Sequence, residues 1–183
     1  MSDDDNQETV ETEERIIRIT GEINEENAEK FVVALHELTA TPGTIHVIIS
    51  SDGGSPEEGF RILDAMAIAK MKQCPIHTIA AGKVYSMGAI VFCAGSERTV
   101  YRHARIMIHP AYYEAGETGS TSRCEAKNMM EELDYYNGVF KRLLDSIGVP
   151  ENIAERMMRE DVYLGAGQAI EYGIASDYEA DII

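Results

Sequence analysis

The stretch that most constrains the fold is Ile76 to Gly95, where an apolar strand pattern gives way to an apolar helix pattern. Ser86 lies at this expected strand-to-helix turn, beside N–H groups that the first helical turn leaves without acceptors. A hydroxyl next to such donors suits acyl transfer, because the donors can receive the developing oxyanion. A plain helix N-cap is the alternative role for Ser86. Val84 also departs from the G-x-S-x-G elbow of α/β-hydrolases.

Composition and charge exclude several classes of protein. The chain has 183 residues, 44% of them hydrophobic and 26% charged, which fits one globular domain. Its 32 acidic and 16 basic residues give a net charge of −16, which argues against a nucleic-acid partner. No apolar run approaches the roughly 20 residues of a membrane span. Three cysteines without a CxxC pair suit a reducing cytosol, so we expect a cytoplasmic protein without a disulfide framework.

Strand and helix patterns alternate along the chain, which predicts an α/β fold with a mixed, mostly parallel sheet. Residues 1–14 are strongly acidic and lack Lys and Arg, so we expect a flexible tail before a single domain over 15–183. The expected strands are 15–20, 44–50, 76–81, 98–101 and 105–108, with a brief extended piece at 159–164. The expected helices are 24–39, 55–72, 86–95, 123–147, 150–158 and 165–172.

Three further features could join Ser86 in a site. Paired glycines, Gly53 and Gly54, follow a buried strand and allow close approach of another segment. A phosphate cradle is disfavoured there, because the P-loop motif is missing and acidic residues flank the turn. His109 comes directly after an apolar strand, at the rim where functional groups gather, and Asp161 lies on a late loop. Serine, histidine and aspartate are the parts of a nucleophile–base–orienter set, although spacing cannot show that they meet.

Three motifs together resemble the proteolytic subunit family of the Clp protease. These are Ser86-Met87-Gly88-Ala89 with the strand ending in His109-Pro110, the Ser51–Gly54 turn, and the late block from Arg159 to Ile174. The resemblance runs in order from about Arg15 to Asp177. It implies a ClpP/crotonase-like fold with a protruding handle, about 111–147, and a serine endopeptidase.

The resemblance also implies roles and partners. Ser86 would be the nucleophile, His109 the general base and Asp161 its orienter, with the N–H groups of Gly54 and Met87 as oxyanion hole. Subunits would form a homo-oligomer of stacked heptameric rings, with active sites inside a chamber that unfolded proteins or peptides reach. The segment 112–121 would line the substrate channel. An AAA+ unfoldase is a possible partner.

Four departures from the family pattern stand out. Asp52 replaces the proline of S-P-G-G, and Pro110 follows His109 where the family usually has a glutamine first. The acidic residues 1–14 show no counterpart of the family's axial loops. His46 and Ile48 occupy positions where many members carry tyrosines that help to dock an unfoldase.

These departures leave other functions open. A phage-type maturation or accessory protease would work alone, without an ATPase. A catalytically silent ring subunit would scaffold an active paralogue, although Ser86, His109 and Asp161 all stand. An acyl-CoA enzyme on the related crotonase scaffold would need no serine nucleophile. No cofactor is expected, and no metal either, because the five histidines lack ligand spacing such as H-x-x-x-H.

Overall fold

The computed structural model describes residues 15–112 and 122–179. The predicted acidic tail, 1–14, and nearly all of the expected channel segment, 113–121, lie outside the described residues. The described strands are β1 (Ile16–Ile23), β2 (Ile45–Gly54), β3 (Ile76–Tyr85), β4 (Glu97–Tyr101), β5 (Arg105–Ile108), β6 (Val162–Leu164) and β7 (Asp177–Glu179). The described helices are α1 (Glu25–Leu38), α2 (Pro56–Met71), α3 (Met87–Cys93), α4 (Arg123–Ser146), α5 (Glu151–Met157) and α6 (Ala166–Glu171).

The seven described strands form one sheet that forks at β3. The first half of β3 pairs with β4, and Lys83–Tyr85 pair with β5, so the main path is β1-β2-β3-β4-β7 with β5 and β6 on a branch. All pairings are parallel except that of β5 with β6. The predicted mixed, mostly parallel α/β fold of the ClpP type is confirmed.

Two strands run further than their apolar patterns predict. β2 extends to Gly54 and β3 to Tyr85, past the points where the apolar runs end. Both extensions are held by neighbouring strands, since Gly54 pairs with Ile23 and Tyr85 with Met107. Tertiary pairing therefore carries the extended backbone right up to Gly54 and Ser86.

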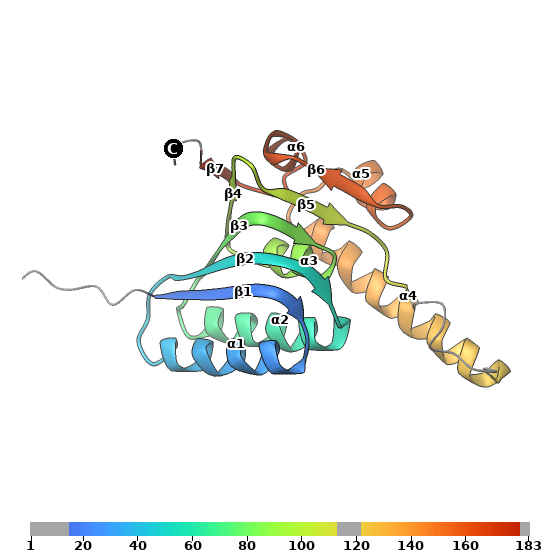
Figure 1. The fold of residues 1–183 in the computed structure, drawn as a ribbon, viewed down its shortest axis with the longest axis horizontal. Coiled ribbons are helices and arrows are strands. Elements are labelled where there is room, and N and C mark those ends of the chain that lie inside the picture. The colour runs from blue at the N-terminus through green and yellow to red at the C-terminus, as the bar shows by residue number, and fades with distance from the viewer. Residues whose placement is uncertain (1–14, 113–121, 180–183) are drawn as a thin grey trace, which may run out of the picture.

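Helices cover one face of the sheet and form the core with it. α1 and α2 lie side by side beneath β1–β3 in Figure 1. Every residue of α3 is buried, which explains its apolar sequence without a polar face. The sheet contributes alternate side chains to this core, as in β2, where Ile45, Val47 and Ile49 are fully buried.

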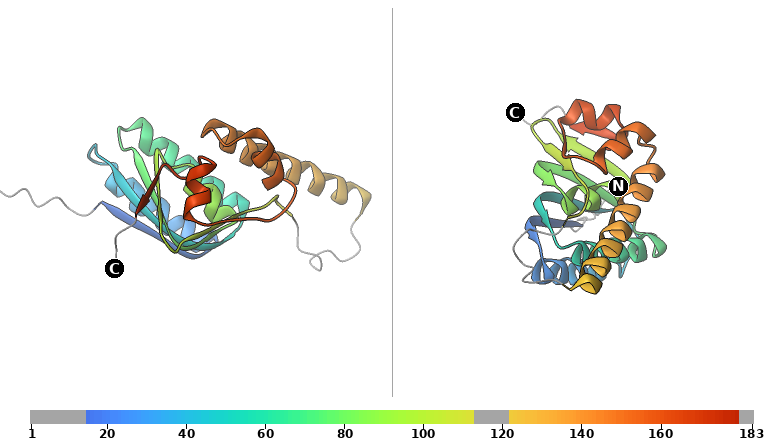
Figure 2. Two further views of the ribbon diagram at one scale, coloured as in Figure 1. Left: turned by 90° about the horizontal axis from the view of Figure 1, so that it is seen from above. Right: turned by 90° about the vertical axis from the view of Figure 1, so that its right-hand side faces the viewer.

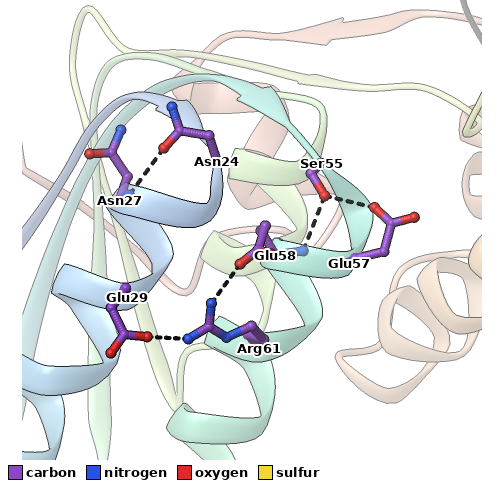
Figure 3. A network of polar contacts seen from close by, with 7 residues as sticks. All are labelled: Asn24, Asn27, Glu29, Ser55, Glu57, Glu58 and Arg61. Atoms are coloured by element: carbon purple, nitrogen blue, oxygen red, sulfur yellow. Dashed lines mark hydrogen bonds and ion pairs between the residues drawn. The ribbon is translucent and has the colours of Figure 1, made fainter.

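Local capping sets where α1 and α2 begin, as Figure 3 shows. Asn24 accepts a hydrogen bond from the N–H of Asn27 at 3.0 Å. Ser55 accepts one from the N–H of Glu58 at 3.2 Å and donates its hydroxyl to Glu57 at 2.7 Å. Arg61 bridges the two helices by pairing with Glu29 and Glu58. The start of α2, directly after Gly53-Gly54, is thus fixed by its own side chains.

The longest helix, α4, begins in a capping box formed by Ser122 and Glu125 and extends away from the body (Figures 1 and 2). Only its later turns bury side chains, Tyr136, Phe140 and Leu144. This is the protruding handle helix expected from the sequence. Its partly buried end packs near α2 and α3, which places it close to the Ser86 turn.

Candidate active site

Ser86 occupies the junction of β3 and α3 in a strained backbone conformation. Its φ of 52° and ψ of −126° lie in a region that non-glycine residues rarely adopt. The Ser86 N–H donates to Met107 O at 2.8 Å, so the turn is tied to β5. Although Ser86 holds the N-cap position of α3, its side chain makes no capping hydrogen bond. The N-cap alternative is therefore wrong, and strain of this kind is typical of a nucleophile lifted out of a sheet.

His109 is brought to Ser86 by the parallel pairing of β3 and β5. Tyr85 and Met107 are register partners, so the residues that follow each strand emerge at the same edge. His109 Nε2 lies 2.8 Å from Ser86 Oγ. This distance allows the imidazole to take the hydroxyl proton as the serine attacks.

The other nitrogen of His109 fixes its tautomer. Nδ1 lies 2.6 Å from the carbonyl oxygen of Pro110, and a carbonyl can only accept. Nδ1 therefore carries the hydrogen, which leaves the Nε2 lone pair free to accept from Ser86 Oγ. The Tyr112 ring, whose centroid is 5.0 Å from that of the imidazole, packs against it.

Asp161 comes directly before β6, and His109 comes directly after β5. β5 and β6 are antiparallel and Ile108 pairs with Val162, so the next step of this register places Asp161 across from His109. Its side chain is exposed, and within 15–112 and 122–179 it makes no hydrogen bond or ion pair. The fold thus brings Asp161 into the neighbourhood of the site, and its role as orienter stays a prediction.

The glycine pair after β2 packs directly against the Ser86 turn. Gly53 has a φ of +101°, and a Cβ added to it would lie 2.6 Å from Ser86 Cβ and 3.1 Å from Met87 N. The Gly53 N–H is already engaged, since it donates to Ser51 Oγ at 3.0 Å. This leaves Gly54 and Met87 as the predicted oxyanion donors. The sequence predicted close approach of another segment at this glycine pair but did not identify the Ser86 turn as that segment.

Comparison with known proteins places this arrangement in a family. A family model described as Clp protease matches residues 4–178. The chain is 36% identical to ATP-dependent Clp protease proteolytic subunit 1 of Prochlorococcus marinus (strain NATL2A) over 166 residues, 88% of this chain and 81% of the relative. It is 31% identical to proteolytic subunit 2 of Parasynechococcus marenigrum (strain WH8102), with the same coverage. A proteolytic subunit of Pleurastrum terricola is also 31% identical, over 88% of this chain and 82% of that protein. The chain belongs to the Clp protease family.

In this Clp protease family member, Asp52, the acidic residue beside the glycine turn, forms an ion pair with Lys83. Lys83 Nζ lies 2.5 Å from Asp52 Oδ1, and both side chains are about half exposed, at 52% and 57%. An exposed pair of this kind contributes little to stability. It does offset the negative charge that Asp52 brings close to the turn where an oxyanion would form.

The Clp-type handle helix contacts both halves of the site. Tyr136 OH donates to Glu57 at 2.6 Å, two residues after the Ser55 cap that follows the glycine turn. Burial and the neighbouring Glu57 and Glu132 carboxylates raise the pKa of Tyr136 far above its usual range. Asn137 Oδ1 accepts from the N–H of Ala111 at 2.7 Å, two residues after His109.

The part of the chain that the structure describes contains neither a candidate metal site nor a candidate membrane span. Those residues contain no group of three or more His, Cys, Asp or Glu side chains placed to hold a metal ion. None of the described helices is long and apolar enough to cross a membrane.

Proposed function

We propose that this member of the Clp protease family is a serine endopeptidase in which Ser86 is the nucleophile and His109 the general base. The observation that carries the proposal is the 2.8 Å contact between His109 Nε2 and Ser86 Oγ, at a serine held in a strained strand-to-helix turn. This contact also argues against a catalytically silent subunit. It argues against an acyl-CoA enzyme too, because that chemistry needs no serine nucleophile.

The reaction follows from the roles of these groups. Ser86 Oγ attacks the peptide carbonyl carbon while His109 Nε2 takes its proton. The N–H groups of Gly54 and Met87 stabilise the oxyanion of the tetrahedral intermediate. His109 then protonates the leaving amine, and an acyl-enzyme ester forms on Ser86. Water, deprotonated by His109, hydrolyses the ester and restores the hydroxyl. The carboxylate of Asp161, opposite His109, favours the imidazolium that forms in each step.

The names of the relatives and the surface of α4 support an assembled enzyme. We propose a homo-oligomer of stacked heptameric rings that takes unfolded proteins or peptides into a chamber, in the cytoplasm. Exposed apolar side chains on the handle, Met130 at 68% and Tyr135 at 60%, suit contact with a second ring. The relatives are named as ATP-dependent proteolytic subunits, which supports an AAA+ unfoldase as partner.

A peptidase that works without an unfoldase is the second candidate. It is favoured by His46 and Ile48, which replace the tyrosines that the family often uses for docking. Casein degradation with and without a Clp-type ATPase from the same source separates the two. A large ATP-dependent stimulation supports coupling, and equal rates support the independent enzyme.

The proposed activity is tested by labelling with a fluorophosphonate probe and by hydrolysis of a fluorogenic peptide. We expect the label on Ser86 in the wild type, and loss of both label and hydrolysis in Ser86→Ala. Ser96→Ala is the matched control, because Ser96 is an exposed serine beyond the other end of α3. Equal peptide hydrolysis by wild type and Ser86→Ala would refute the assignment.

A further inference from the structure

The exposed ring of Tyr112 packs against the general base of the proposed reaction. Its centroid lies 5.0 Å from that of the His109 imidazole, and the two ring planes meet at 39°. Tyr112 is 63% exposed, so burial of apolar surface does little to explain why the ring lies there. The contact with a chemically active imidazole therefore needs an explanation other than core packing.

Tyr112 lies against a face of the imidazole rather than an edge. His109 Nε2 lies 2.8 Å from Ser86 Oγ, and Nδ1 lies 2.6 Å from the carbonyl oxygen of Pro110. Hydrogen bonds at these two nitrogens lie in the plane of the ring. The interplanar angle of 39° with Tyr112 is nearer to stacking than to an edge-on contact. The two in-plane bonds and the ring of Tyr112 thus hold the imidazole from three directions.

The backbone that carries Tyr112 is tied to the handle helix. The N–H of Ala111, the residue before it, donates to Asn137 Oδ1 of α4 at 2.7 Å. That turn of α4 is anchored in the core, since Tyr136 is 5% exposed and its ring packs against Phe60 of α2. The side chain of Tyr112 therefore starts from a fixed backbone position, which keeps its ring within reach of the imidazole.

The contact becomes stronger in the step where a peptidase needs it. A general base must be neutral before Ser86 attacks, and His109 becomes an imidazolium as it takes the proton. The face of an aromatic ring carries negative charge density and attracts a cation within about 6 Å of its centroid. Because a neutral imidazole feels this attraction far less, the ring lowers the energy of the transition state more than that of bound substrate. A contribution of this kind raises kcat and leaves KM unchanged.

We propose that Tyr112 is a positioning residue for His109 and that its ring face stabilises the imidazolium formed during peptide hydrolysis. The proposal rests on the proposed peptidase function and leaves the expected roles of Ser86, His109 and Asp161 unchanged. The sequence assigned Tyr112 only to a segment that would line the substrate channel. The contact with the base gives this side chain a separate role in the chemical step.

Substitutions that change the electron density of the ring test the proposal. Phenylalanine and its analogues with one, two or three ring fluorines, introduced at position 112 by nonsense suppression, keep the shape of the ring while each fluorine weakens its negative face. We expect Tyr112→Phe to keep kcat for peptide hydrolysis within about twofold of wild type, and kcat to fall stepwise along the fluorinated series. Tyr112→Leu should lower kcat about two- to fivefold, with KM unchanged.

Tyr101→Leu is the matched control and should leave kcat and KM unchanged. Tyr101 ends β4, whose pairing with β3 stops at Ala80, well before Ser86. Equal kcat values for phenylalanine and its trifluorinated analogue at position 112 would refute the electrostatic role. A rise in KM with unchanged kcat would place Tyr112 against the substrate instead and would also overturn the proposal.

A readout that needs no activity separates failure of this proposal from failure of the peptidase function. Solid-state NMR of sedimented protein with ¹³C-labelled histidine reports the Cε1–Hε1 signal of His109, which His109→Gln identifies. The ring current of residue 112 should displace this signal in the wild type and in Tyr112→Phe relative to Tyr112→Leu. An identical signal in the wild type and in Tyr112→Leu would contradict the contact, whether or not the protein hydrolyses peptides. A displaced signal without fluorophosphonate label on Ser86 would instead refute the peptidase function, and with it the role of Tyr112 in that reaction.

Discussion

Replacing Gly53 by alanine tests the close packing of the glycine turn on Ser86. The new Cβ would lie 2.6 Å from Ser86 Cβ and 3.0 Å from Tyr85 O, at a backbone φ of +101°. Ordinary carbon–carbon contacts are about 3.5–4.0 Å. The two segments must therefore separate by roughly 1 Å, and neither is a flexible side-chain end that could simply turn away.

The magnitude follows from two separate costs. A left-handed conformation costs a non-glycine residue about 1–3 kcal/mol, and overpacking costs about 1–3 kcal/mol more. Gly148→Ala isolates the first cost, because Gly148 has a φ of +85° and nothing within 4 Å of an added Cβ. At about 2–4 °C per kcal/mol for a chain of this size, Gly53→Ala should melt about 2–12 °C below Gly148→Ala.

Activity should respond more strongly than stability. A displacement of about 1 Å in a catalytic group costs on the order of a hundredfold in rate, so Gly53→Ala should label with fluorophosphonate about a hundred times more slowly. Gly148→Ala should label at the wild-type rate. The measurements are a thermal melt and a labelling time course at equal protein concentration. Equal melting temperatures for the two variants and wild-type labelling by Gly53→Ala would refute the packing argument.

Two further predictions concern buried groups. Burial raises the pKa of the Cys93 thiol to about 12, so iodoacetamide at pH 8 should label Cys93 only after unfolding in guanidinium; native labelling as fast as that of the exposed Cys124 would contradict this. Tyr136→Phe removes hydroxyl contacts with Glu57 and Glu132 and should lower the free energy of unfolding by about 1–3 kcal/mol at pH 7. Hydrogen bonds from the Ser55 hydroxyl and, second, from the Tyr136 hydroxyl lower the pKa of Glu57. The stability that Tyr136 contributes through the Glu57 carboxylate is therefore fully present above the pKa of Glu57 in the unfolded chain. It is lost as the pH falls through the lower pKa of Glu57 in the folded protein. Urea titrations of both proteins at pH 7 and pH 3 measure the difference, which should shrink at pH 3; an equal or larger difference there would contradict the linkage.

Much of the fold could be predicted because local signals were strong. Ser55 followed by Pro56 and two acidic residues marked the start of α2, and the spacing of apolar residues marked α4. The extensions of β2 to Gly54 and of β3 to Tyr85 could not be predicted from these signals. The polar and glycine residues at these two strand ends stay extended because they pair with strands that lie far away in the sequence. Gly54 pairs with Ile23 of β1, and Tyr85 pairs with Met107 of β5.

The candidate site likewise has features that the sequence predicted and features that it did not. Ser86 and His109 were marked by their places after apolar strands, and they meet at 2.8 Å. The apposition of Gly53 and Ser86 was missed because it joins residues from two different strand ends. The Pro110 carbonyl was missed because backbone groups leave no trace in residue type, and Asn137 because it lies 26 residues beyond Ala111.

The sequence by itself determined the chemical inventory of this protein: a serine at a strand-to-helix turn, a histidine after a strand, paired glycines and a long amphipathic helix. Residue type and spacing along a single strand or helix are enough to specify such features. Only the tertiary structure decided which groups face one another, because the parallel register of β3 and β5 and the anchoring of α4 on α2 are long-range. The serine and its base could therefore be predicted from the sequence. The carbonyl of Pro110, which accepts from His109 Nδ1, is apparent only in the tertiary structure.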